Sequence, residues 1–385
     1  FAALATGGAV VVSQYLGAKE QKHANASSGQ LILLSALLGV GVGVFCFVLA
    51  RPMIRLCYGS IDADVLEAGV LYLRITAVSY PFLAMYNAGA ALFRSMGNSK
   101  ISMQISILMN VINIVGNAVC IFGFKMGVDG VAWPSVVSRV IAAALILGRC
   151  YQKGHALTVP KTVRLDTGMA KRILGIGVPV ALQDGLIQIA FILITVIANL
   201  RGLTDSAAVG IVEKLISFLF LVPSSMLSAV SAIGAQNIGA GDYGRAKQTM
   251  WYAIGIAVGF GVIVSVLFQF IAEPVVGLFT PDEGVIAAGG QYMHGYIFDC
   301  LFAGIHFCFS GYFCACGKSG LSFMHNIIAV ALVRVPGVYF TSKLFPATLL
   351  PMGLATAAGS LVSVIICVIA FAVISRRGKA EAAGV

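Results

Sequence analysis

The sequence predicts an all-α, polytopic membrane protein made of two six-helix bundles related by pseudo-two-fold symmetry. Composition is the first reason: 59% of the 385 residues are hydrophobic, only 10% are charged, and the mean hydropathy is +0.95. Such a chain has too little polar surface to coat a water-soluble globule. An internal repeat is the second reason, since Ser-Gln-Tyr-Leu-Gly-Ala at 13–18 returns as Ala-Gln-Asn-Ile-Gly-Ala at 235–240. Two similar halves in a membrane are typical of transporters, whose halves rock around a substrate.

The repeat continues beyond this motif. Pro52 and Pro274 keep the same spacing of 222 residues. After a two-residue slip the correspondence pairs the following residues of the first half with those of the second: Tyr72, Phe93, Gly97 and Ser99 with Tyr292, Phe313, Gly317 and Ser319.

Long apolar segments predict the membrane helices in chain order. They are continuous rather than alternating, which indicates helices and not barrel strands, and most can cross a hydrocarbon core of about 30 Å. With a partial span at 1–18 we expect eleven helices, at 31–50, 65–93, 101–124, 131–148, 185–200, 215–241, 248–272, 284–317, 319–342 and 344–375.

The repeat also predicts how the chain is divided. A helix near 173–200 has no counterpart in the first half, because subtracting 222 places it before residue 1. We therefore expect the first helix and part of the second to be missing. The expected parts are an incomplete N-terminal bundle, a cytoplasmic linker, a C-terminal bundle and a tail, at 1–152, 153–170, 171–378 and 379–385.

The basic residues predict the orientation. If the loop after the first repeat motif is cytoplasmic, that side collects sixteen lysines and arginines and the opposite side five, as expected for a multi-pass protein of the plasma or inner membrane. Topology and anionic lipid then explain the net charge of +10, and we expect the bilayer as a partner and no nucleic acid.

The sequence lacks the motifs of several functional classes. The nine cysteines show no paired zinc-site spacing, and no nucleotide-binding loop or catalytic motif is present. We therefore expect neither an enzyme nor a cofactor, and no metal beyond a sodium ion. Any uphill work must use a proton or sodium gradient.

Ionisable residues inside the apolar segments are the main functional candidates, because each is unfavourable in lipid and should face the interior. Asp184 and Asp299 each lie roughly 25 Å below the same outer boundary by helical rise. At matching depth they could hold sodium or share protons, with Gln188 and Gln183 as polar contacts in the cavity. Glu213 is a shallower cavity candidate. The alternative for every one of these charges is a structural hydrogen bond between helices. We expect structural buried charges at Arg74, Arg139, Lys214 and Arg334, and the position of Arg334 near a helix end also fits an interfacial or packing residue.

Two further polar features leave alternatives open. Asn110, Asn113 and Asn117 recur on one helix face and either line a cavity or join helices. His306 shares the face of Asp299 and is either a proton relay or a packing histidine.

Several of these motifs together resemble the multidrug and toxic compound extrusion (MATE) family. The resemblance rests on Ser-Gln-Tyr-Leu-Gly-Ala-Lys-Glu at 13–20, Ala-Gln-Asn-Ile-Gly-Ala-Gly-Asp at 235–242, Phe-Arg-Ser-Met-Gly-Asn at 93–98, Gly-Val-Pro-Val-Ala-Leu-Gln at 177–183 and Arg-Val-Pro at 334–336. It implies a two-lobed, twelve-helix exporter that exchanges protons or sodium for amphipathic compounds. It also implies acids on the helices of Asp184 and Asp299, although both stand about one turn from the positions of the family's motif.

The sequence thus predicts a monomeric secondary-active antiporter that exports small organic compounds, expected to be cationic, with Asp184 and Asp299 coupling the ion. One alternative is a lipid-linked precursor flippase of the same superfamily, which should have a cavity dominated by arginine and lysine. A membrane protein without transport activity is the other alternative.

Overall fold

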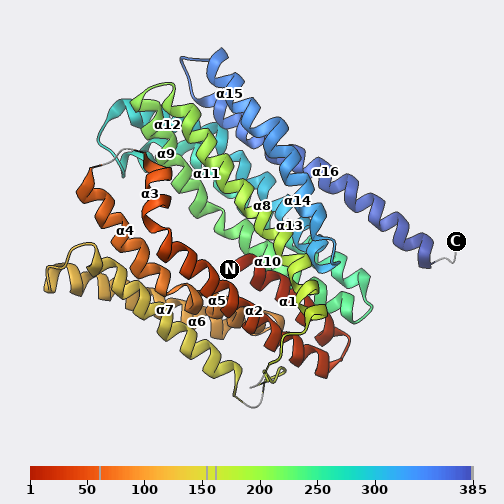
Figure 1. The fold of residues 1–385 in the computed structure, drawn as a ribbon. Coiled ribbons are helices and arrows are strands. Elements are labelled where there is room, and N and C mark those ends of the chain that lie inside the picture. Colours follow the sequence, from red (N-terminus) through yellow and green to blue (C-terminus); the bar gives the residue numbers. More distant parts are fainter. Residues whose placement is uncertain (60–61, 153–154, 161–162, 383–385) are drawn as a thin grey trace. The chain divides into compact units, whose positions relative to one another are not determined.

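The protein is described by a computed structural model that covers the backbone of residues 1–59, 62–152, 155–160 and 163–382 (Figure 1). Within these ranges the ordered elements are all helices. The chain divides into two compact units, Phe1–Val178 and Pro179–Val385, and the boundary falls at a proline inside one long helix, α8 (Thr167–Asn199). Parts of the expected linker, 153–154 and 161–162, lie outside the described residues.

The predicted number of membrane segments is confirmed. Of the described helices, nine are long and apolar enough to cross a membrane, and one further pair passes the same test together with a bend of 46°. The shorter apolar helix at Ala2–Gly17 is the expected partial span. Together these give eleven segments, in the order that the apolar runs predict.

The first unit contains eight helical elements ahead of α8. The bounds are α1 (Ala2–Gly17), α2 (Gln21–Val48), α3 (Ala50–Tyr58), α4 (Ala63–Val78), α5 (Tyr80–Ser95), α6 (Ser99–Ala118), the π-helical turn η1 (Val119–Gly123) and α7 (Asp129–Cys150). Helix α5 is packed against α1, α2 and α7. It is rich in small residues, so neighbouring helices can approach closely.

The second unit follows with a similar series. After α8 come α9 (Leu203–Leu219), α10 (Leu221–Gly239), α11 (Tyr243–Gly277), α12 (Glu283–Tyr296), α13 (Phe298–Ala315), α14 (Ser319–Ala329), the π-helical turn η2 (Val330–Arg334), α15 (Val335–Leu344) and α16 (Leu350–Ala382). Helix α13 is packed against α10, α11 and α16 and buries most of its residues. It is therefore the central helix of this unit.

The internal repeat is visible in the element order. Helices α4 and α5 are separated by a break at Ser79, and their counterparts α12 and α13 by a break at Ile297. A π-helical turn follows α6 in one unit and α14 in the other. The turns after α5 and α13 also match, because Gly97 and Gly317 both adopt a left-handed backbone with φ of +73° and +71°. Only glycine does this at little energetic cost, and it ends both helices.

Helices α12 and α16 of the second unit approach each other through two glycines. A Cβ atom on Gly353 would lie 2.4 Å from the carbonyl oxygen of Tyr292, and one on Gly295 would lie 2.6 Å from that of Leu350. Such contacts between backbones are typical of helix pairs in membranes. This close packing holds α16 beside the start of α13, where the candidate site lies.

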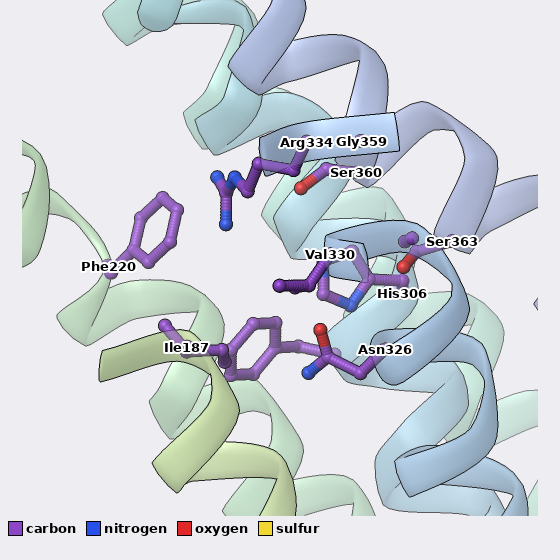
Figure 2. A pocket seen from close by; sticks show the side chains of 11 residues that line it. Ile187, Phe220, His306, Asn326, Val330, Arg334, Gly359, Ser360 and Ser363 are labelled. Atoms are coloured by element: carbon purple, nitrogen blue, oxygen red, sulfur yellow. The ribbon is translucent and has the colours of Figure 1, made fainter. Parts of the chain in front are cut away.

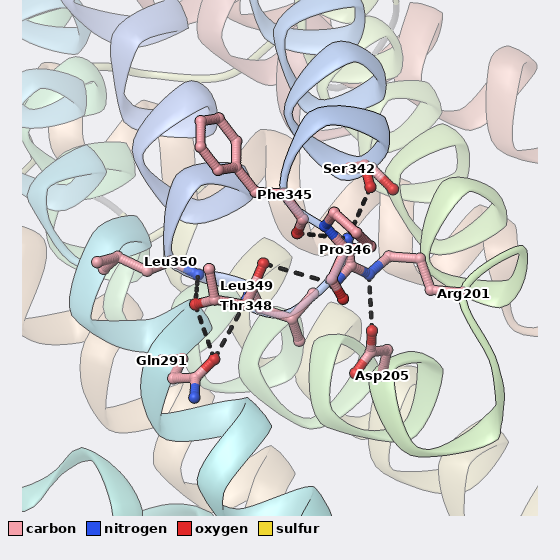
Figure 3. A network of polar contacts seen from close by, with 9 residues as sticks. All are labelled: Arg201, Asp205, Gln291, Ser342, Phe345, Pro346, Thr348, Leu349 and Leu350. Carbon is pink, nitrogen blue, oxygen red and sulfur yellow. Dashed lines mark hydrogen bonds and ion pairs between the residues drawn. The ribbon is translucent and has the colours of Figure 1, made fainter.

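Arg201, in the turn between α8 and α9, joins this turn to the α15–α16 connection (Figure 3). Its Nε donates to Asp205 at 2.6 Å. Its two terminal nitrogens donate to four backbone carbonyls of the connection, those of Ser342, Phe345, Pro346 and Thr348, at 2.8 to 3.4 Å. All three guanidinium nitrogens are thus used. From the other side of the connection, Gln291 of α12 accepts hydrogen bonds from Thr348 and Leu349.

Candidate functional site

The centre of the second unit holds a buried ion pair. Asp299, in the first turn of α13, has no exposed surface, and Arg334 at the end of η2 is 5% exposed. The terminal Nη2 of Arg334 donates to Oδ2 of Asp299. A buried charge is strongly unfavourable without a partner, so each of these residues requires the other.

The local backbone explains how Arg334 reaches this position. Pro336 follows it in the first turn of α15 and has no N–H to continue an α-helical ladder. The chain passes through the π-helical turn η2 instead, a distortion that occurs frequently at functional sites. Gly359 of α16 leaves room for the arginine, because a Cβ atom there would lie 2.8 Å from the Cβ of Arg334. The burial of Arg334 agrees with the prediction of a structural buried charge; only the alternative of an interfacial residue is wrong, because these three features bring the side chain into the core.

A second carboxylate lies near the ion pair. Glu213 of α9 is 8% exposed, and its Oε2 is 2.8 Å from the hydroxyl of Thr195 on α8. Arg334 and Glu213 are close enough to interact electrostatically. Among the described residues, the other carboxylate oxygen of Glu213 has no hydrogen-bond partner. The buried cluster therefore contains two acids and one base.

Two tyrosines close the cluster on the side of α12. The rings of Tyr292 and Tyr296 are fully buried, with centroids 5.3 Å apart. The guanidinium carbon of Arg334 lies 5.8 Å from the centroid of Tyr296, within cation–π range. The surrounding core is apolar, so the charges of the cluster are weakly screened.

A narrow cavity adjoins the ion pair (Figure 2). Arg334 and Ser360 lie on one side of it and His306 and Asn326 on another, and Ser363 completes its polar lining. It offers about 10 Å³ to the centre of a water molecule, close to the space that one buried water needs. Its apolar wall is formed by Ile187, Phe220, Phe307, Ala329 and Val330.

A larger pocket lies on the other side of this apolar wall. It has a volume of about 260 Å³ and contains Asp184 and Gln188 of α8 together with Ser217 and Ser224. Ile187, Phe220 and Phe307 line both spaces, and the two phenylalanine rings meet edge to face with centroids 6.4 Å apart. Phe191 and Leu221 complete the lining. The pocket thus combines aromatic surface with one carboxylate.

The expected pairing of Asp184 with Asp299 is wrong. Asp184 is exposed in the larger pocket and lies near Cys314, close to the end of α13. Asp299 lies 15 residues earlier on the same helix, a distance of about 22 Å along the axis. Thr195, only six residues from Arg201, already lies at the level of the ion pair. The outer ends of α8 and α12 are therefore not level, and depths counted from the two loops cannot be compared.

The two glutamines predicted as cavity contacts, Gln188 and Gln183, differ in their exposure. Gln188 is exposed in the larger pocket, as expected for a cavity contact. Gln183 is fully buried, and neither of its amide atoms has a hydrogen-bond partner among the described residues. Its position in a polar cavity stays a prediction.

The asparagine stripe joins helices. Asn113 donates to the hydroxyl of Ser135 on α7 at 2.8 Å, and Asn117 donates to Asn113 at 3.3 Å. Asn110 donates to a carbonyl of its own helix. Of the two alternatives, the contacts favour the one in which the stripe holds α6 to α7.

Two residues expected to be buried structural charges are not buried. Arg74 is exposed and lies over the ring of Phe47, to whose carbonyl it donates at 3.3 Å. Lys214 is exposed, because it points away from the buried face that carries Glu213. Arg139 is half-buried and donates to Ser79 at 2.7 Å.

Sequence reasoning did not select Thr195, Tyr292, Tyr296, His325 and Ser360. Four of them are serine, threonine or tyrosine, which are common in apolar segments, and of these only Tyr292 carries a signal, because it takes part in the repeat. His325 carries the signal that selects His306, a titratable ring in an apolar segment.

Comparisons with known proteins agree with this architecture. A family model for MatE matches residues 1–119 and 179–340. The chain belongs to the MATE family. Its relatives include the probable multidrug resistance protein YoeA of Bacillus subtilis, 27% identical over 73% of this chain and 62% of YoeA. The multidrug export protein MepA of Staphylococcus aureus is 26% identical over 89% of this chain and 75% of MepA.

Solved MATE structures share the fold of this family member. A MATE protein in complex with MaL6 superposes with a TM-score of 0.92 at 19% identity, covering 98% of this chain and 85% of the other. A MOP superfamily transporter from Pyrococcus furiosus superposes with a TM-score of 0.88 at 18% identity, covering 98% and 84%. The chain spans less than two thirds of YoeA and of the uncharacterized transporter YisQ, 62% and 64%. The nine apolar helices and the family membership together make this a multi-pass protein of the plasma membrane.

Proposed function

We propose that this MATE protein is a secondary-active antiporter that exports small, amphipathic, cationic compounds in exchange for a proton or sodium ion. The observation that carries the proposal is the charge balance of the buried cluster. Arg334 forms its ion pair with one of two buried carboxylates, that of Asp299, so a single base faces two acids and Glu213 has no ion-pair partner of its own among the described residues. A lone ionised carboxylate is unfavourable in this environment, so Glu213 requires a proton or a sodium ion as a neutralising partner.

The hydrogen bonds around Glu213 favour a proton. The hydroxyl of Thr195 lies 2.8 Å from Glu213 and 2.9 Å from the carbonyl oxygen of Phe191. One hydroxyl hydrogen serves two acceptors poorly. A protonated Glu213 can donate to Thr195, which then donates to Phe191, so that each of these two hydrogen bonds has its own donor hydrogen. Loss of that proton would disturb the contact between α8 and α9.

The larger pocket supports a cationic substrate. Its lining combines the carboxylate of Asp184 with three phenylalanine rings, Phe191, Phe220 and Phe307, and no basic residue. Aromatic faces and a carboxylate attract organic cations. A flippase for lipid-linked precursors should instead present arginine and lysine to an anionic headgroup, so the lining argues against that alternative. The relatives YoeA and MepA, a probable multidrug resistance protein and a multidrug export protein, agree with the proposal.

Transport by the full-length protein in liposomes tests this function. We expect an imposed proton gradient to drive uptake of ethidium into vesicles, and a sodium gradient to drive less. Glu213→Gln should abolish the response to the gradient while ethidium still binds, because glutamine imitates the permanently neutral acid. Glu273→Gln, a change at an exposed glutamate of α11, is the matched control. Wild-type protein that ignores both gradients would refute the antiporter proposal.

Asp184→Asn separates substrate binding from ion coupling. Because Asp184 lies in the larger pocket and not in the buried cluster, we expect weaker ethidium binding with the response to the gradient retained. The reverse pattern would contradict the assignment of the pocket to substrate.

A further inference from the structure

Unpartnered polar groups meet around the narrow cavity beside Arg334. Arg334 Nε, His306 Nδ1 and Asn326 Nδ2 are all buried, and none has a hydrogen-bond partner among the described residues. All three side chains line this cavity. Buried donors and acceptors are almost always satisfied, and a polar space of this size is suited to an ordered water. An ordered water in this cavity would therefore connect Arg334 to His306 by hydrogen bonds.

Beyond His306 the polar groups continue. Its ring centroid is 5.4 Å from that of His325 on α14. His325 is bracketed by two hydroxyls, with Nε2 2.8 Å from Ser310 and Nδ1 3.2 Å from Ser363. Ser322 donates to the carbonyl of Ser310 at 3.2 Å. Each of these side chains is buried.

These groups follow one face of the central helix. Asp299, His306 and Ser310 lie at positions i, i+7 and i+11 of α13, which places them on a single stripe. The stripe begins at the ion pair and runs toward the end of α13 that the basic residues predict to be cytoplasmic. In an apolar bundle, such a series of ionisable and hydroxyl groups is typical of a proton pathway.

We propose that this stripe is a hydrated proton path. In it, His306 and His325 relay protons between the Arg334–Asp299 pair and the hydroxyls of Ser310 on α13 and Ser322 on α14. The proposal rests on the proposed proton antiport and adds the route to it. A neutral imidazole has one donor and one acceptor nitrogen. Each ring accepts a proton on one nitrogen and releases the proton of the other, which leaves it in the opposite tautomer; rotation of the ring restores the first tautomer before the next proton passes in the same direction. Proton number is therefore conserved at each ring.

The surroundings of His306 are suited to this role. The charged or titratable groups that face it are His325 of α14 and Arg334 of η2, while α16 adds the hydroxyls of Ser360 and Ser363. Ser360 also lies against Asp299. The ring of Phe307 packs on that of His306, with centroids 5.0 Å apart, and it separates the stripe from the larger pocket. Protons and substrate would thus use different routes.

The test measures proton movement and substrate binding separately. The full-length protein is reconstituted with a pH-sensitive dye inside the vesicles, and ethidium is added outside. We expect His306→Gln to slow the ethidium-evoked proton flux about 100-fold. Ethidium binding and ethidium–ethidium exchange, which need no net proton movement, should be unchanged. His294→Gln on α12, outside the stripe, is the matched control and should behave as the wild type.

Each outcome decides between the relay, a packing role and the antiport itself. His306→Gln protein that moves protons at the wild-type rate would overturn the relay. So would a variant that loses binding, exchange and proton flux together, because that result indicates packing alone. If His306→Gln does not fold, Ser363→Ala replaces it, and a proton flux equal to that of the wild type would again overturn the relay. A wild type that shows no ethidium-evoked proton flux would instead refute the proposed antiport.

Discussion

The two units use equivalent positions with opposite charge. In the first unit, Arg139 of α7 donates to the buried Ser79 at the break between α4 and α5. The two-residue slip of the repeat places Ser79 on Asp299, and the matching starts of α7 and α16 at Asp129 and Leu350 place Arg139 on Ser360. In the first unit the cation Arg139 faces the hydroxyl of Ser79. At the equivalent positions of the second unit, the hydroxyl of Ser360 faces the anion Asp299.

This reversal explains why the second unit needs more partners. The half-buried Arg139 can remain partly solvated, and a hydroxyl is sufficient for it. The fully buried Asp299 requires a cation, which the π-helical turn η2 supplies as Arg334. Duplication therefore fixed the positions of the helices and left the charges at these positions free to diverge.

The largest expected difference between the units is in stability. Asp299→Ala leaves the Arg334 guanidinium buried without its partner and should lower the free energy of unfolding by about 3–5 kcal/mol. Ser79→Ala removes one hydrogen bond from the partly solvated Arg139 and should lower it by about 1 kcal/mol. Unfolding of the purified protein in detergent, followed by circular dichroism, measures both.

A double variant sharpens this contrast. Replacing Asp299 and Arg334 together with leucine and methionine removes both buried charges, so most of the lost stability should return. Equal losses for Asp299→Ala and Ser79→Ala would show that the two equivalent positions do not differ in their electrostatic environment.

The fold was largely predictable because its signals extend over many residues. Each membrane helix is encoded by a long apolar run, and the duplication by motifs such as Gly97 and Gly317, which recur because a left-handed turn requires glycine in both units. The candidate site was only partly predictable. Asp299, Glu213 and Arg334 could be selected as charges in apolar segments.

Their partners could not be predicted, for two physical reasons. A π-helical turn changes the face on which Arg334 emerges, and Pro336 indicates an interruption of the helix there without indicating that the turn is π-helical. The depth of α8 relative to α12 also depends on tertiary packing. For this reason, counting residues from the loops pairs Asp299 with Asp184, whereas in the structure Glu213 is the acid near the Arg334–Asp299 pair. Counting residues from a loop gives depth only when the loops are level.

A second difference between the units concerns arginines at helix ends. Arg201→Ala removes hydrogen bonds to Asp205 and to four backbone carbonyls of the α15–α16 connection. We expect a loss of about 2–3 kcal/mol. Among the described residues, Arg51 of the first unit pairs with the exposed Glu67 alone, and Arg51→Ala should lower the free energy of unfolding by less than about 1 kcal/mol.

Protection from proteolysis provides a local measurement of the same contrast. Loss of Arg201 should expose the connection at Phe345–Leu349 to cleavage faster than the rest of the second unit unfolds. If the two arginine variants unfold alike and the connection stays protected, Arg201 is not what holds it.

The smallest expected effect compares the contacts between equivalent helix pairs. Helices α6 and α7 are joined by Asn113 and Ser135, whereas their counterparts α14 and α16 are joined by His325 and Ser363. Asn113→Ala should lower the free energy of unfolding by about 0.6 kcal/mol, the average for hydrogen bonds between membrane helices. It should leave proton-driven ethidium transport unchanged, because the contact in the first unit is structural.

Asn110→Ala is the matched control for this last comparison, since the side chain of Asn110 contacts only a carbonyl of its own helix among the described residues. Neither stability nor transport should change in that variant. If Asn113→Ala reduced transport while stability stayed the same, the asparagines would line a functional cavity. The ion path that we propose for the second unit would then not be confined to that unit.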